Sequence, residues 1–217
     1  MQNTLISEIL IKQNKRVCTS RDIHEIMPGE KLFSIISRLI NANWIVPVGF
    51  RGVYYVLDAE ERSRSFFKLG NFQILIKTLN RVFEKEWYFG RITSLSLLGK
   101  IQQPVSTYYI LNKKFSRRFD SRLLGKVVLQ KTSGTISGGC GILTKKYKDD
   151  FYRVCSVERN LADYLYGYVH RPADKEQIIE MYHKYLPDRE DMLDIIIKCY
   201  PRLSAIKMKT VLKEVYG

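Results

Sequence analysis

The clearest hydrophobic pattern in the chain lies in residues 31–41. Drawn as a helix, this segment places its apolar side chains on one side: Leu32, Ile35, Ile36, Leu39 and Ile40. The other side carries polar side chains at positions i, i+3, i+4 and i+7: Ser34, Ser37, Arg38 and Asn41. The pattern predicts an amphipathic helix whose apolar side packs and whose polar side faces outward.

A hairpin is predicted directly after this helix. Residues 44–48 and 53–57 are runs of β-branched and aromatic residues, and the turn between them holds Gly49 and Gly52, which tolerate positive φ. Upstream, residues 4–13 have helical spacing, and Thr19 or Ser20 can cap a second helix that ends at Pro28-Gly29. The order of three helices and two strands predicts a winged helix-turn-helix over residues 1–57.

This arrangement predicts which side chains would meet DNA. Arg38 and Asn41 can make bidentate hydrogen bonds to guanine and adenine edges in the major groove. We expect Lys31, Ser34 and Ser37 to support them. Contacts to phosphate are expected from Thr19, Ser20 and Arg21, and a further contact to DNA is expected from Arg51 on the wing. The alternative interpretation is an ordinary solvated helix face.

The remainder of the chain predicts a mixed α+β domain. Residues 58–70 are charged and are expected to be a connector. The domain at 71–217 begins with a helix over 71–83 and a short helix over 93–98; strands are expected over 105–111, 123–129, 142–144 and 151–155. Residues 156–217 alternate helical patterns with breakers and predict a helical end. The fold class is therefore α+β.

Charge favours an anionic partner. The net charge is +14 with a pI near 9.6, which makes double-stranded DNA the first expected partner. The excess of basic over acidic residues is +3 in residues 1–57, +6 in 58–120, +5 in 121–155 and zero in 156–217. Since no run of 18 apolar residues and no signal peptide occurs, we expect a cytoplasmic protein without a membrane contact.

A second basic group lies in the middle of the chain, after the aromatic pair Tyr108 and Tyr109. Its members are Lys113, Lys114, Arg117, Arg118 and Arg122. Mixed basic and aromatic side chains can follow a phosphate backbone, so this group is a candidate second nucleic-acid surface. A solvated surface loop explains the same residues nearly as well.

Patterns typical of catalysis are weak. Cys18, Cys140, Cys155 and Cys199 form no CxxC pair, so buried free thiols are favoured over a disulfide or a metal site. Gly134, Gly138, Gly139 and Gly141 lack a P-loop ending and predict a flexible loop. The pair Asp188 and Glu190 opens a helix, which favours capping over a metal-dependent nuclease. We expect no enzyme and no cofactor.

Several short segments occur in an order typical of one known family. They are Ser37-Arg38-Leu39-Ile40, Trp44-Ile45-Val46-Pro47-Val48, Arg51-Gly52-Val53-Tyr54-Tyr55, Tyr88-Phe89-Gly90, Ser94-Leu95, Gly99, Pro104 and Ser156-Val157-Glu158-Arg159-Asn160-Leu161-Ala162-Asp163. Over most of its length the chain resembles the AbiEi family of antitoxin and transcriptional regulators from type IV toxin–antitoxin systems.

The resemblance implies a non-enzymatic protein with two roles. Its N-terminal winged helix would repress the operon that encodes it, and its C-terminal domain would antagonise a nucleotidyltransferase-like toxin without a stable complex. The alternatives are a stand-alone winged-helix regulator and an RNA- or protein-binding module without a toxin partner. For residues 156–163, an ion pair involving Glu158 and Arg159 that fixes the helix to the sheet is favoured over a contact with a partner.

Overall fold

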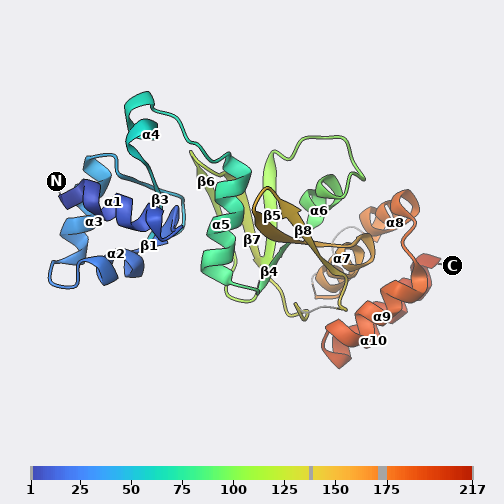
Figure 1. Cartoon of the computed structure of the whole chain (residues 1–217). Coiled ribbons are helices and arrows are strands. Elements are labelled where there is room, and N and C mark those ends of the chain that lie inside the picture. The colour runs from blue at the N-terminus through green and yellow to red at the C-terminus, as the bar shows by residue number, and fades with distance from the viewer. Residues whose placement is uncertain (1, 137–138, 171–174, 217) are drawn as a thin grey trace. The chain divides into compact units, whose positions relative to one another are not determined.

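The structure is a computed structural model that describes residues 2–136, 139–170 and 175–216 (Figure 1). Its fold is α+β, with two sheets and helices packed against them. The chain divides into unit 1, residues 1–84 with 119–126, and unit 2, residues 85–118 with 127–217.

Unit 1 begins with short helices that alternate with short strands. In chain order its elements are α1 (Gln2–Lys12), β1 (Val17–Thr19), α2 (Ser20–Ile26), α3 (Leu32–Asn41), β2 (Ile45–Pro47), β3 (Val53–Val56), α4 (Ala59–Arg64) and α5 (Asn71–Phe83). Strand β3 lies between β1 and β2 and is antiparallel to both. Strand β1 was not predicted, because three residues are too few to display a period of two.

The core of unit 1 forms where α1, α2 and α3 pack against this sheet. Ile6, Leu10, Ile23, Ile35 and Leu39 are almost completely buried in it. Burying each of these aliphatic side chains stabilises the folded state by roughly 1.5–3 kcal/mol. The apolar residues that recur at helical spacing in the sequence thus pack into one core.

The segment 58–70, which we expected to be a connector, folds onto unit 1. Glu61 is fully buried, and its carboxylate accepts hydrogen bonds from the Arg16 guanidinium at 2.6 Å, the Tyr55 hydroxyl at 2.5 Å and the Lys68 backbone N–H at 2.7 Å. Unit 1 therefore runs past residue 57 and includes α4 and α5. The charged sequence resembles that of a surface segment and concealed this, because charged residues such as Glu61 are seldom fully buried.

Unit 2 contains most of a six-stranded sheet and the C-terminal helices. Its elements are β4 (Trp87–Phe89), α6 (Arg91–Leu97), β5 (Thr107–Asn112), β6 (Arg117–Ser121), β7 (Gly125–Lys131), β8 (Ile142–Tyr147), β9 (Asp150–Cys155), α7 (Val157–His170), α8 (Lys175–Tyr185), α9 (Arg189–Cys199) and α10 (Arg202–Tyr216). The strand order is β6-β7-β5-β4-β9-β8. Residues 119–126, which form the end of β6, the turn after it and the start of β7, belong to unit 1.

The sheet is mixed. Strand β4 is antiparallel to β5 and parallel to β9, and β8 pairs with β9 as a hairpin. Strand β6 was not predicted: it contains Arg117, Arg118 and Asp120, and as an edge strand it does not need an apolar face.

Helices α7 to α10 pack against one another at the C-terminal end of unit 2 (Figure 1). Their shared core includes Leu161, Leu165, Ile196 and Met208, all nearly or fully buried. This confirms the predicted helical end. Among the described residues, no helix has both the length and the apolar composition needed to cross a bilayer.

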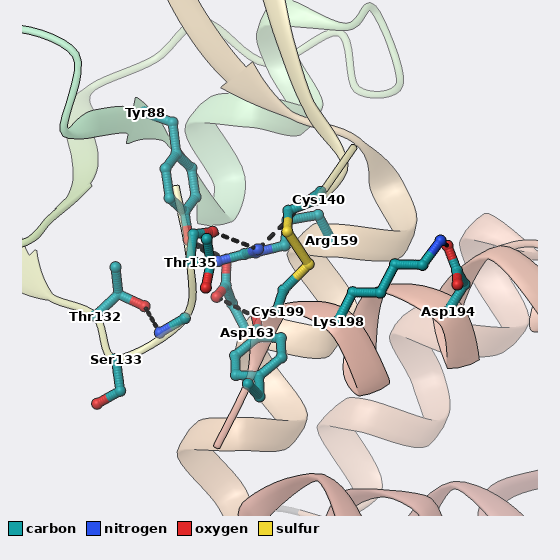
Figure 2. Close-up of a disulfide and its surroundings, with 12 residues drawn as sticks. Tyr88, Thr132, Ser133, Thr135, Cys140, Arg159, Asp163, Asp194, Lys198 and Cys199 are labelled. Atoms are coloured by element: carbon teal, nitrogen blue, oxygen red, sulfur yellow. Dashed lines mark hydrogen bonds and ion pairs between the residues drawn. A yellow bond between two sulfur atoms is a disulfide. The ribbon is translucent and has the colours of Figure 1, made fainter. Parts of the chain in front are cut away.

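The prediction for the cysteines was wrong for two of the four. Cys140 and Cys199 form a disulfide across a sequence separation of 59 residues (Figure 2). Cys18 and Cys155 are free and buried as expected, and burial raises the pKa of each thiol to about 12. The disulfide could not be predicted because no local spacing indicates that the loop before β8 passes the end of α9.

Candidate nucleic-acid interface

Helix α3 separates a buried face from an accessible one. Ile35 and Leu39 are completely buried, whereas Ser34 and Asn41 are exposed and Ser37 is half-buried. The structure therefore places the predicted polar row on the outer side of the helix. The strongly amphipathic sequence of α3 is the cause, since apolar residues recur at intervals of three or four positions along it.

Arg38 lies at the border of this outer face. Its guanidinium makes an ion pair with Glu30 at 3.2 Å, and both side chains are about one-third exposed, 39% and 34%. Lys31 precedes the helix and is exposed. Because partly exposed ion pairs contribute little free energy, Arg38 can exchange Glu30 for another anion or a base edge.

The start of α2 is organised by a capping box. Thr19 donates its hydroxyl to the Asp22 carboxylate at 2.7 Å and accepts the Asp22 backbone N–H at 3.3 Å. Thr19 thus serves as a cap, which competes with the phosphate contact that we predicted for it. Ser20 donates its backbone N–H to the Gly52 carbonyl at 2.8 Å, which joins α2 to the hairpin turn. Arg21 is 88% exposed and pairs with Glu25.

A buried carboxylate fixes α2 within unit 1. The Asp22 carboxylate accepts hydrogen bonds from Arg81 of α5 and from Lys15, the latter at 2.9 Å. Burial by itself raises the pKa of this carboxyl, but the bonds from Arg81, Lys15 and Thr19 outweigh it and lower the pKa far below its ordinary value. Asp22 therefore stays ionised and holds α2 against α5.

The turn of the hairpin between β2 and β3 is packed. Phe50 is buried, and its ring lies edge-on to Phe83 at 6.0 Å and Phe119 at 5.1 Å. Gly49 has a φ of +97°, and a Cβ there would lie 2.6 Å from the Phe119 ring. Arg51 remains exposed at the tip. The turn is thus supported from inside unit 1 and presents Arg51 outward.

The predicted second basic surface is divided between the units. Arg122 belongs to unit 1, whereas the other four residues belong to unit 2. Lys114, Arg117 and Arg118 are exposed. Lys113 donates its ammonium to the Ser133 carbonyl at 3.2 Å, and partial burial followed by the nearby Arg159 charge lowers its pKa. The structure does not bring the five residues together in one unit.

The segment 156–163 leads into α7, and its Arg159 and Asp163 are buried, whereas Glu158 is only half-buried (Figure 2). Arg159 pairs with Asp163 at 3.4 Å rather than with Glu158. The guanidinium also donates to the Cys140 carbonyl at 3.2 Å, and Asp163 accepts the hydroxyls of Tyr88 at 2.7 Å and Tyr200 at 2.6 Å. The Arg159–Asp163 pair of α7 is thus connected to the sheet through Tyr88 and to the end of α9 through Tyr200.

The glycine-rich stretch that we expected to be flexible packs against this cluster. A Cβ at Gly134 would lie 2.5 Å from the Arg159 guanidinium, and one at Gly141 would lie 2.8 Å from the Arg159 Cβ. Gly138 lies outside the described residues. Glycine is therefore needed at Gly134 and Gly141 for close approach of the backbone.

The acidic residues that the structure describes do not gather into a metal site. Asp188 caps α9, where its carboxylate accepts the Asp191 N–H at 2.9 Å. This confirms the capping interpretation of that carboxylate. Within the part of the chain that the structure describes, no three His, Cys, Asp or Glu side chains come together as a group able to hold a metal ion.

Sequence reasoning missed one residue on α3. Phe33 is 82% exposed, although its residue type predicts burial. Its position in the helix could have indicated this exposure, because Phe33 precedes Ser37 by four residues and so lies on the same side of the helix.

Comparison with known proteins identifies a similar fold. The crystal structure of RV2827C protein from Mycobacterium tuberculosis matches 96% of this chain and 80% of its own, with a TM-score of 0.53 and 12% sequence identity. No family model and no curated protein matches the sequence. At this identity the likeness concerns the fold alone.

Proposed function

We propose that the chain is a sequence-specific DNA-binding transcriptional repressor, and that α1 to β3 of unit 1 form a winged helix-turn-helix. In this proposal α3 enters the major groove, and the hairpin of β2 and β3 is the wing. Asn41 and Arg38 read base edges, supported by Ser34, Ser37 and Lys31, the last through contact with a phosphate. Arg21 and Arg51 also contact phosphates, whereas Ser20 and Thr19 position α2.

One observation carries the proposal: α3 has an accessible polar face on the side away from the buried Ile35 and Leu39. The element order supports it, since a short strand between the first two helices and a hairpin after the third is the arrangement of winged helices. The net charge of +14 supports attraction to DNA.

The test measures binding of the full chain to the DNA upstream of its own gene by gel shift and footprinting. Arg38→Ala should weaken specific binding by about 1–3 kcal/mol and relax base preference at one position. Arg64→Ala is the matched control, because Arg64 also pairs with a glutamate on the surface of unit 1. Equal losses in the two variants, or no protected sequence, would contradict the proposal.

We further propose that the chain represses a toxin–antitoxin operon and acts as a type IV antitoxin against a nucleotidyltransferase-like toxin. The support is the resemblance to AbiEi regulators, which extends through residues 156–163. Co-expression with a nucleotidyltransferase-like toxin encoded beside the gene tests this role. Restored growth without co-purification of the two proteins is expected, and unrelieved toxicity would exclude it.

A further inference from the structure

Phe33 is the most accessible large hydrophobic side chain among the described residues, at 82%. In the same unit, Trp44, Phe50 and Tyr55 are nearly or completely buried, and Phe66 is 38% exposed. Phe33 lies in the first turn of α3, beside the exposed Lys31 and Ser34. An apolar ring thus stands among polar groups at the N-terminal end of this helix.

Helical spacing places the ring on the face that we assign to DNA. Phe33, Ser37 and Asn41 follow one another at intervals of four residues, so they lie along one side of α3. In helix-turn-helix proteins, the N-terminal residues of the corresponding helix contact base edges. Phe33 is therefore in the part of α3 that would come nearest to the bases.

The chemistry of the major groove offers one apolar partner for such a ring. Thymine alone presents a methyl group there, while the other bases present hydrogen-bond donors and acceptors. We propose that Phe33 contacts the 5-methyl group of a thymine and gives the chain a preference for thymine at one position of its site. This inference rests on the proposed DNA-binding function.

A second copy of the chain fits this face less well. A two-fold interface places the same surface on both partners, so the net positive charge that Lys31, Arg38 and the Arg38 partner Glu30 carry together would face a copy of itself. Like charges brought together oppose association, whereas the same cations favour a polyanion. The charge around Phe33 therefore favours DNA as the occupant.

The experiment selects a duplex from a randomised library with the full chain and then replaces each thymine by uracil in turn. Uracil keeps the hydrogen-bonding groups of thymine and lacks only the methyl. Removing one buried methyl-sized group should weaken binding about fourfold at a single position. Phe33→Ala should lose this sensitivity while the other positions keep their base preference.

Salt dependence provides a second readout. Since Phe33 is uncharged, Phe33→Ala should leave the slope of log affinity against log salt unchanged, whereas Lys31→Ala should reduce that slope by about one. Circular dichroism should show the same fold for both variants, because both side chains are exposed.

The outcomes separate the two proposals. If no duplex is selected, the proposed function fails and this inference fails with it. If a duplex is selected and no thymine is sensitive to uracil, or if Phe33→Ala keeps the sensitivity, the assignment of Phe33 alone fails. Loss of a dimer by Phe33→Ala in sedimentation without DNA would also overturn it.

Discussion

Helices α3 and α7 both carry polar side chains four residues apart, but they use them in opposite ways. On α3, Ser34 is exposed and Arg38 is partly exposed. On α7, Arg159 is completely buried and Asp163 is 4% exposed. The same sequence spacing thus produces an accessible face in unit 1 and an internal ion pair in unit 2.

The difference lies in what surrounds each helix. Arg159 is enclosed by Tyr88 and Tyr200, whose rings lie 5.3 Å and 4.9 Å from its guanidinium carbon, and its N–H groups bond to backbone carbonyls. Burial, then the Asp163 carboxylate, raises the pKa of both tyrosines, so they remain neutral donors. These groups stabilise unit 2, whereas those of α3 are accessible to a ligand.

The largest expected effect is on stability and concerns Arg159. Arg159→Ala should lower the free energy of unfolding of unit 2 by about 3–5 kcal/mol, because Asp163 would be left buried without its cation. Lys198→Ala is the matched control, since Lys198 and Asp194 form an ion pair at the same spacing on the surface (Figure 2). It should cost less than about 1 kcal/mol. Similar losses in denaturant titrations would contradict the buried role.

The disulfide should have the next largest effect. Replacing both Cys140 and Cys199 by Ser should destabilise unit 2 by about 2–4 kcal/mol, because the cross-link closes a long loop in the unfolded chain. Hydrogen exchange should show faster opening of α9 and unchanged protection of α3. A reducing agent should lower the free energy of unfolding of the original chain and should not change that of the double variant. Equal responses of the two proteins would exclude the disulfide.

A smaller change is expected for the cap of α2. Thr19→Ala should cost about 1 kcal/mol of stability, because the first turn loses its hydrogen-bond acceptor. If Thr19 acts as a cap alone, the salt dependence of DNA binding should not change. A reduced slope would instead assign Thr19 to a phosphate contact, as its sequence position first indicated.

Asp58 should contribute a modest acid sensitivity to unit 1. Burial raises the pKa of Asp58, but bonds from Lys68, the Glu61 backbone and Arg16 outweigh it and lower the pKa to about 2. The bonded carboxylate therefore adds stability above the ordinary aspartate pKa near 4, and this contribution is lost as the pH falls from about 4 to about 2. Asp58→Asn should flatten the dependence of stability on pH between about 4 and about 2, measured by chemical denaturation. An unchanged dependence would contradict the assignment of this effect to Asp58.

Much of the fold could be predicted from local patterns. The periodicity of α3 and α5 and the breakers between the C-terminal helices were sufficient to predict those elements. Long-range relations could not be predicted. Nothing near Glu61 indicates that Arg16 and Tyr55 enclose it, and nothing near Cys140 indicates Cys199. For the candidate site, spacing predicted which side of α3 faces outward, whereas the exposure of Phe33 required the structure.

The most direct test of the account measures the preference of the full chain for its selected duplex over a scrambled duplex, at one salt concentration. Ser34, Ser37 and Asn41 are replaced together by Ala, and Ser63→Ala on α4 is the control. We predict that the triple variant loses most of the preference and keeps non-specific binding, because base contacts specify and phosphate contacts do not. An unchanged preference in a folded triple variant would contradict the claim that α3 reads DNA.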